Sequence, residues 1–285
     1  MNKIKKIGVV GAGQMGAGIA QVFAMKGFEI TLQDISEEQC KKALTGIEKS
    51  LTKLAEKKKI TQETARQALN LIATTTSLDD LSHVDFVVEA VTENLELKSR
   101  IFSALDRITQ ENIILATNTS SISITKIAAA TNRKDKVIGM HFMNPVPIMP
   151  GVEVISADET SKETENCVYD LVNILEKTLI RSKDRAGFVA NRILMPMILE
   201  AILALEEGVS EKEDIDKGMV TCCNFPMGPL ALADFIGLDT CASIMNVMAD
   251  GLQNQRYRPP ALLQRLVKKG KLGRKSGEGF YKYEL

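Results

Sequence analysis

A glycine-rich turn near the N-terminus constrains the fold of this chain more than any other feature. The hexapeptide from Gly11 to Gly16 (GAGQMG) follows residues 4–10, which have the apolar pattern of a short buried strand. Residues 15–26 then show the periodicity of a helix, and residues 29–33 are predicted to form a second strand that ends at Asp34. A strand, a glycine turn, a helix and a strand within about 30 residues form a βαβ unit.

This context predicts a dinucleotide site. Gly11 permits the tight turn, Gly13 lets the backbone approach a pyrophosphate, and Gly16 lets the helix pack close to the strand. We expect Asp34 to accept hydrogen bonds from ribose hydroxyls and to repel a 2′-phosphate, so that NAD is preferred over NADP. FAD or another nucleotide, or a turn without a ligand, are the alternatives. The predicted cofactor contacts of this unit are Gly11, Ala12, Gly13, Gln14, Met15, Gly16 and Asp34.

Strand and helix patterns alternate over the first two thirds of the chain. A long amphipathic helix is predicted from Ser36, with Gln39 placed for a reciprocal capping box, and a shorter helix at 62–70 completes an inserted hairpin with a basic face. Further helices are predicted at 95–108 and 160–177, and strands at 72–75, 85–90, 113–117, 137–142, 152–156 and 179–182. The pattern predicts an α/β fold with a Rossmann-type, doubly wound, mostly parallel sheet.

Beyond Asp184 the strand patterns end. We therefore predict an NAD-binding domain at 1–184 and an all-helical domain for substrate binding and dimerisation at 185–285. Residues 188–207 are apolar on nearly every side, which predicts a buried helix and makes a subunit interface plausible. Ser210, with Glu213 three residues later, is expected to cap the next helix.

Composition excludes some classes of protein. The 285 residues carry 36 basic and 36 acidic side chains, which argues against a nucleic-acid partner. Five cysteines without a CxxC pair predict reduced thiols, and no metal site is predicted. The N-terminus is basic to Lys6 and then apolar to Met25, but its glycines make a poor membrane-spanning helix, so we expect a cytoplasmic protein without a membrane partner.

The chain has only two histidines, and one is a candidate proton donor. His83 lies in a polar stretch and is predicted to be a solvated loop residue. His141 ends a predicted strand, at the end where ligands bind in open α/β sheets. Transfer of a hydride to a ketone needs a proton donor of near-neutral pKa, which suits His141.

Two further groups accompany this histidine. Glu153 lies among apolar residues in the next predicted strand, where pairing with His141 would offset the cost of its burial. A solvent-facing Glu on an edge strand is the alternative. Residues 118–121 (NTSS) follow another strand, and their hydroxyls can either bind a substrate oxygen or cap the next helix.

Several long motifs together resemble the 3-hydroxyacyl-CoA dehydrogenases, and among them the bacterial 3-hydroxybutyryl-CoA dehydrogenases. The resemblance covers essentially the whole length. The motifs that carry it are Gly11–Gly16, Val88–Glu89–Ala90 with Glu93–Asn94, Asn118–Ser121, His141–Pro147, Gly187–Arg192, Pro226–Pro229, Gly237–Asp239, Leu272–Lys275 and Phe280–Tyr281.

The resemblance implies roles for particular residues. His141 is similar to the family's acid/base and Glu153 to its partner, while Ser120 and Asn191 are similar to the residues that hydrogen-bond the substrate carbonyl. The implied cofactor-side positions are Ala90, Glu93, Lys98, Ser120 and Asn144, and Ser50 and Lys57 match positions that contact CoA. The family also implies a helical C-terminal domain that forms a homodimer or a higher homo-oligomer.

The implied reaction is the NAD-dependent interconversion of acetoacetyl-CoA and (S)-3-hydroxybutyryl-CoA in fatty acid or butyrate metabolism. Pro150 and Gly151 depart from the family pattern before Glu153 and put its register in question. A dehydrogenase of similar fold that acts on a free hydroxy acid and a non-catalytic NAD-binding protein are the rival interpretations.

Overall fold

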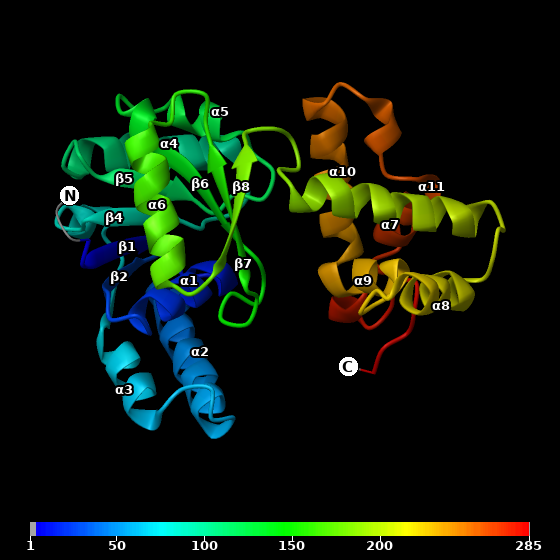
Figure 1. Cartoon of the computed structure of the whole chain (residues 1–285), viewed down its shortest axis with the longest axis horizontal. Coiled ribbons are helices and arrows are strands. Elements are labelled where there is room, and N and C mark those ends of the chain that lie inside the picture. The colour runs from blue at the N-terminus through cyan, green and yellow to red at the C-terminus, as the bar shows by residue number, and fades with distance from the viewer. Residues whose placement is uncertain (1–3, 285) are drawn as a thin grey trace. The chain divides into compact units, whose positions relative to one another are not determined.

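The computed structural model describes residues 4–284, so the first three residues of the basic N-terminal stretch lie outside the described part. The chain divides into two compact units, Met1–Asp184 and Arg185–Leu285. Each unit has its own hydrophobic core, and each is described separately below (Figure 1).

The first unit is built on one eight-stranded sheet, counted over the described residues, with the strand order β3-β2-β1-β4-β5-β6-β7-β8. Neighbouring strands are parallel except β6 and β7, which are antiparallel. The strands are β1 (Lys6–Val10), β2 (Glu29–Gln33), β3 (Ile72–Thr75), β4 (Phe86–Glu89), β5 (Ile114–Thr117), β6 (Val137–Phe142), β7 (Gly151–Ser156) and β8 (Thr178–Lys183). The predicted doubly wound, mostly parallel sheet is confirmed.

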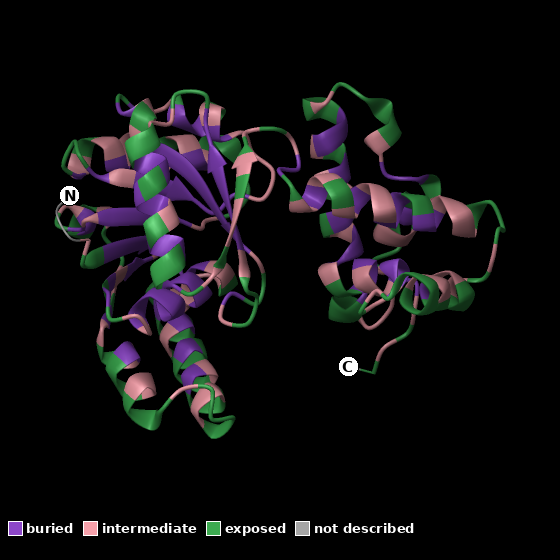
Figure 2. Cartoon of the chain, viewed as in Figure 1, coloured by how far each residue is buried: buried purple, intermediate pink, exposed green. Residues whose placement is uncertain are grey.

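Helices cover this sheet because each buries an apolar stripe. A single core cluster joins α1, α2 and α6 to the strands, whereas α4 packs on α5. Figure 2 shows the central strands as the most continuously buried part of the unit, whereas the edge strand β8 is intermediate to exposed. The helices are α1 (Gln14–Ala24), α2 (Glu37–Glu56), α3 (Gln62–Asn70), α4 (Leu95–Ile108), α5 (Ile124–Ala128) and α6 (Lys162–Ile174), with short 3-10 turns η1 (Leu78–Leu81) and η2 (Lys134–Lys136).

The predicted helical insertion is present as α2 and α3, which extend away from the sheet as a hairpin (Figure 1). Ser36 caps α2 by accepting a hydrogen bond from Gln39 N at 3.2 Å. The prediction of a reciprocal bond from the Gln39 side chain is wrong. The Gln39 side chain donates to Ala12 O instead, and Ser36 N donates to Asp34. The hairpin is thereby tied to the glycine turn.

The second unit is helical. It contains α7 (Ala190–Glu206), α8 (Lys212–Cys223), α9 (Pro229–Ile236), α10 (Leu238–Gly251) and α11 (Ala261–Lys268), with η3 (Gln255–Tyr257) and η4 (Arg274–Ser276). The expected cap at Ser210 is wrong, because α8 is preceded by Glu211 as its N-cap.

Helix α7 is less buried than its sequence predicts. Its core side includes Met195, Ile198 and Ile202, but Ile193 is 70% exposed and several other apolar residues are only partly buried. Within residues 4–284 no single helix is long and apolar enough to cross a membrane; α9 and α10 together meet that criterion of length and composition but are bent by 97°.

Two buried carboxylates fix the C-terminal tail of this unit. Asp216 accepts hydrogen bonds from Leu230 N and Ala231 N at the start of α9, and Asp234 accepts from Phe280 N and Tyr281 N. A Cβ atom on Gly228 would lie 2.2 Å from the Asp216 side chain. The motifs around residues 226–229 and 272–281 therefore have a structural role, which is to pack against these two carboxylates.

Candidate functional site

The glycine turn lies where the order of the sheet reverses, between β1 and β4. Gly11 has a φ of +98°, and a Cβ atom there would lie 2.8 Å from Ala90 O. A Cβ atom on Gly16 would lie 1.7 Å from Gly11 O, so the helix can approach the turn only without a side chain. Such a switch point is where open α/β sheets bind ligands.

The packing that requires glycine at positions 11 and 16 does not explain Gly13. A Cβ atom at this position would have no described heavy atom within 4 Å, so the fold of residues 4–284 does not itself require glycine there. Gly13 is the N-cap of α1, and no side chain of the described residues caps this helix end. The open space and the uncapped N–H groups form a cradle for an anionic group at the positive end of a helix. These residues fit a dinucleotide pyrophosphate.

Asp34 follows β2 and is oriented by two backbone N–H groups. Ala12 N donates to its Oδ2 at 2.8 Å, and Ser36 N donates to its Oδ1 at 3.0 Å. Each carboxylate oxygen can accept more than one hydrogen bond, so both can still bind ribose hydroxyls.

His141 and Glu153 lie directly opposite one another in the antiparallel pair β6–β7. His141 Nδ1 is 2.8 Å from Glu153 Oε2, and the two residues are 6% and 0% exposed. Because an ionised carboxylate only accepts hydrogen bonds, this contact suits the tautomer in which Nδ1 carries the proton and donates it to Glu153. Pro150 and Gly151 do not shift the register, because β7 begins at Gly151 and Glu153 pairs with His141. The alternative of a solvent-facing Glu on an edge strand is wrong, because β8, not β7, is the edge strand. His83, by contrast, is exposed in a turn.

The loop after β5 is tied to the strand that carries His141. Asn118 Oδ1 accepts a hydrogen bond from Phe142 N at 2.8 Å. The alternative in which the hydroxyls at 119–121 cap the next helix is wrong, because α5 is capped by Ser123. Ser120 is half-buried in this loop, one residue beyond the buried Thr119.

Glu93 holds the same loop from the β4 side. Its Oε1 accepts hydrogen bonds from Thr119 Oγ1 (2.7 Å), Ser120 N (3.0 Å), Ser121 N (2.9 Å) and Ser121 Oγ (2.9 Å). Burial raises the pKa of Glu93, but the positive charge of Lys98 and these hydrogen bonds outweigh it, so the pKa lies below its ordinary value. Glu93 is therefore an ionised clamp on the backbone of Ser120.

Lys98 occupies a place that its sequence position does not reveal. It is 1% exposed, and its Nζ lies 2.6 Å from Glu89 Oε1 and 3.6 Å from Glu93 Oε2. Glu89, which is 0% exposed, also accepts from Thr117 Oγ1. The sequence motif at residues 88–90 contains Glu89 but predicts no role for it. A carboxylate at the end of the apolar strand β4 was the signal that it needed a buried partner.

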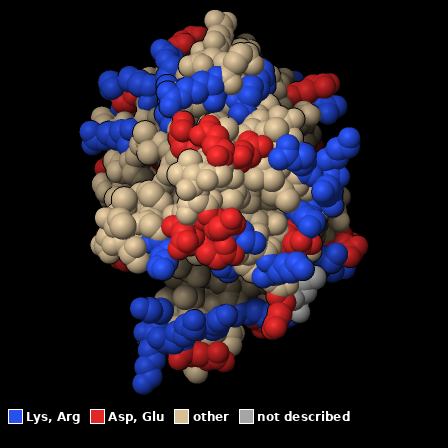
Figure 3. All heavy atoms as spheres, turned by 90° about the vertical axis from the view of Figure 1, so that its right-hand side faces the viewer, with Lys and Arg blue, Asp and Glu red and all other residues tan. Residues whose placement is uncertain are grey.

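A groove of about 420 Å³ joins three of the predicted segments. Gly13 and Gln14 from α1, Ser50 from α2, and Asn144 from the loop after β6 all line it. Lys57 does not line it; this exposed residue lies at the end of α2 with Lys58 and Lys59. Figure 3 shows basic side chains gathered on the lowest part of the molecule, at the height of the α2–α3 loop in Figure 1.

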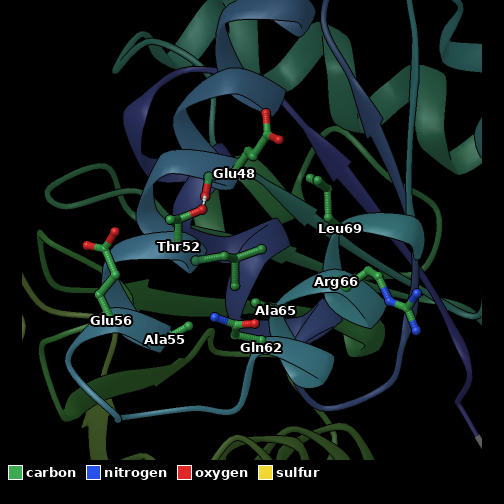
Figure 4. Close-up of a pocket in the computed structure, with 9 residues that line it drawn as sticks. Glu48, Thr52, Ala55, Glu56, Gln62, Ala65, Arg66 and Leu69 are labelled. Atoms are coloured by element: carbon green, nitrogen blue, oxygen red, sulfur yellow. Dashed lines mark hydrogen bonds between the residues drawn. The ribbon is translucent and has the colours of Figure 1, made fainter.

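Two further predicted residues are placed within their own units. Met15 packs against the core. Asn191 is 8% exposed in the first turn of α7, in the helical unit. A second cavity of about 330 Å³ lies between α2 and α3, with Glu48, Glu56 and Arg66 at its rim (Figure 4). It contains none of the predicted site residues.

Comparison with known proteins places the chain in a family. The family model described as "3-hydroxyacyl-CoA dehydrogenase, NAD binding domain" matches residues 6–185, and the model of the C-terminal domain of the same family matches residues 187–283. A protein of Bacillus subtilis named "Probable 3-hydroxybutyryl-CoA dehydrogenase" is 51% identical over 282 residues, which cover 99% of this chain and 98% of that protein.

Solved structures agree. The (S)-3-hydroxybutyryl-CoA dehydrogenase PaaH1 from Ralstonia eutropha is similar with a TM-score of 0.96 and 48% identity, over 99% of this chain and all of that one. FadB2 from Mycobacterium tuberculosis is similar with a TM-score of 0.97 and 43% identity, over 99% of this chain and 100% of that one. The chain belongs to the 3-hydroxyacyl-CoA dehydrogenase family and is an enzyme with that family's NAD-binding domain and C-terminal domain.

Proposed function

We propose that this enzyme interconverts acetoacetyl-CoA and (S)-3-hydroxybutyryl-CoA with NAD as the hydride carrier. The observation that carries the proposal is the buried His141–Glu153 pair, held at 2.8 Å on adjacent strands. The names of the relatives support the substrate, since the Bacillus subtilis protein is named "Probable 3-hydroxybutyryl-CoA dehydrogenase" and the Ralstonia eutropha protein (S)-3-hydroxybutyryl-CoA dehydrogenase.

His141 is the proposed general acid and base. In the reductive direction its Nε2 gives a proton to the C3 oxygen of the substrate, and in the oxidative direction the neutral imidazole takes that proton back. Glu153 keeps the imidazole in one tautomer and stabilises its charged form. When bound, NADH supplies the hydride that C3 receives.

Ser120 and Asn191 are the proposed hydrogen-bond partners of the substrate carbonyl, where negative charge develops during reduction. The clamp of Glu93 on the Ser120 backbone supports this role for Ser120. Asn144, exposed in the loop after β6, is the proposed neighbour of the nicotinamide. Asp34 is the proposed determinant for NAD over NADP.

The CoA portion is assigned to the hairpin and to the part of the groove that Ser50 lines, because Gly13 and Asn144 in the same groove are proposed contacts of the dinucleotide. Ser50 lines the groove together with Gly13 and Asn144, and Lys57 adds positive charge at the end of α2. A cationic, exposed hairpin suits the phosphates of CoA, whereas a free hydroxy acid would need a cationic clamp close to the reacting carbon.

The experiment follows NADH oxidation with acetoacetyl-CoA, with free acetoacetate, and with acyl chains of increasing length. The proposal predicts efficient turnover of acetoacetyl-CoA and far slower turnover of acetoacetate, and a preference for NADH over NADPH. Comparable rates with the free acid would favour the rival dehydrogenase. NADH binding without turnover of any of these compounds would favour a non-catalytic protein.

Two further assignments belong to the proposal. The partly buried apolar side chains of α7 support a homodimer formed through the helical unit. All five cysteines lie within residues 4–284 and are free thiols, which suits a cytoplasmic enzyme of fatty acid or butyrate metabolism.

A further inference from the structure

The loop between β6 and β7 forms one wall of the groove. Asn144, Pro145, Val146 and Pro147 from this loop line the cavity. Its own hydrogen bonds are few, because residues 145, 147 and 150 are prolines without an N–H group. Ile148 N and Met149 N both donate to Pro145 O, at 3.0 and 2.9 Å. The loop therefore depends on other elements to hold it in place.

Lys177, between α6 and β8, supplies that support. Its Nζ donates to Val146 O at 2.8 Å and to Met149 O at 2.7 Å, so a single ammonium group bonds both sides of the turn. The next residue, Thr178, donates its N–H to Pro150 O at 2.8 Å. Lys177 and Thr178 thus donate three hydrogen bonds to the loop.

The environment of this ammonium group is unusual for a surface lysine. Burial lowers the pKa of Lys177, and no carboxylate within the described residues 4–284 offsets that effect. Removing a charge from water without an ionic partner is costly. Within the described residues, the hydrogen bonds from Nζ to two backbone carbonyls offset part of that cost. Lys26, at the same end of α6, has instead an ordinary ion pair with Glu176 at 2.7 Å.

The loop that Lys177 holds packs closely against α1, the helix that follows the glycine turn. Val146 is 2% exposed, and a Cβ atom on Gly18 of α1 would lie 2.8 Å from Val146 Cβ. A shift of Val146 therefore changes the contact between the loop and α1, and with it the width of the groove. Asn144 lies two residues earlier on the same short loop.

We propose that Lys177 is a positioning residue for the groove, which fixes the 143–150 loop so that Asn144 and Val146 keep their places beside α1. This inference rests on the proposed function for the identity of the ligand. Lys177 does not itself line the groove, and its ammonium group is bonded to Val146 O and Met149 O of the loop.

The test compares Lys177→Met with Lys26→Met, a matched control that removes a neighbouring ammonium group without touching the loop. For Lys177→Met we expect the KM for acetoacetyl-CoA to rise about ten- to a hundredfold with a smaller change in kcat, as for a lost binding interaction. Lys177→Arg, which retains charge and donors, is expected to recover part of this loss. Lys26→Met is expected to behave as the wild type.

A second readout does not depend on the substrate. In the unliganded full chain, hydrogen exchange of the Ile148 and Met149 amides should be faster in Lys177→Met and unchanged in Lys26→Met. If Lys177→Met does not fold, Lys177→Gln, which keeps two N–H donors without the charge, is measured in the same way. Unchanged KM and unchanged exchange would overturn the inference. A wild type that fails to turn over acetoacetyl-CoA would instead overturn the proposed function, and the exchange measurement would still test the loop.

Discussion

At the scale of single residues, the site is defined by carboxylates whose burial is compensated. Glu153 is fully buried beside His141, and Glu89 is fully buried beside Lys98. Each would be costly alone, so each requires its partner. The two pairs differ in what they do: the first is proposed to exchange a proton with the substrate, and the second anchors the residues around Glu93.

Glu93 permits a prediction with a defined pH dependence. Its pKa lies below the ordinary value of 4.5, so the folded protein favours the carboxylate. The stabilisation is present above pH 4.5 and is lost as the pH falls through the lowered pKa. Because the side chain is 38% exposed, we expect Glu93→Gln to cost only about 1 kcal/mol of unfolding free energy at pH 7.

Urea-induced unfolding of the wild type and of Glu93→Gln, from pH 7 down to about pH 3, measures this effect. The difference in unfolding free energy should shrink towards the acid end. A difference that stays constant with pH would show that the carboxylate charge is not what stabilises the 119–121 loop.

At the scale of elements, the glycine turn separates glycines needed for folding from a glycine needed for binding. A methyl group at Gly16 would collide with Gly11 O, whereas one at Gly13 would meet no described atom within 4 Å. We therefore expect Gly13→Ala to fold with only a small loss of thermal stability, since Ala is a poorer N-cap residue than Gly, but to bind NADH about tenfold more weakly or worse, a loss of ~1.4 kcal/mol or more.

Isothermal titration with NADH and thermal unfolding of the apoprotein check this prediction. Gly218→Ala is the matched control, because Gly218 in α8 also has open space around its Cβ position. The control should bind NADH as the wild type does. Unimpaired binding by Gly13→Ala would contradict the cradle.

The elements themselves were largely predictable, because their sequence signals are local. The βαβ unit around Gly11–Gly16 and the strand Val137–Phe142 follow from apolar patterns bounded by turn residues. The caps were less predictable. Gln39 and Ser210 match a capping pattern, but tertiary partners decide: Gln39 turns to Ala12 O, and α8 begins one residue later than Ser210 would allow.

The site was predictable where strand ends and motifs mark it, and not where it depends on buried partners. The pairing of His141 with Glu153 could be inferred from the cost of burying a carboxylate. The contacts of Lys98 with Glu89 and of Lys177 with the 143–150 loop could not, because they join segments through side-chain geometry that no local pattern encodes.

At the scale of the whole molecule, the two units have separate cores and match two family models in sequence order. Helix α7 of the second unit has apolar side chains that its own core buries only in part, namely Leu194, Met197, Leu203 and Leu205. We predict that these side chains contribute to a homodimer. Sedimentation equilibrium at micromolar concentration should give a dimer, and a monomer under those conditions would contradict the prediction.

The central claim is that His141 exchanges a proton with the substrate beside the bound dinucleotide. The most direct measurement is steady-state turnover of acetoacetyl-CoA by His141→Gln, with the Kd for NADH determined on the same preparation. The account predicts a fall in kcat of about 10²- to 10⁴-fold with NADH binding retained. Near-full turnover by a variant that binds NADH normally would contradict it.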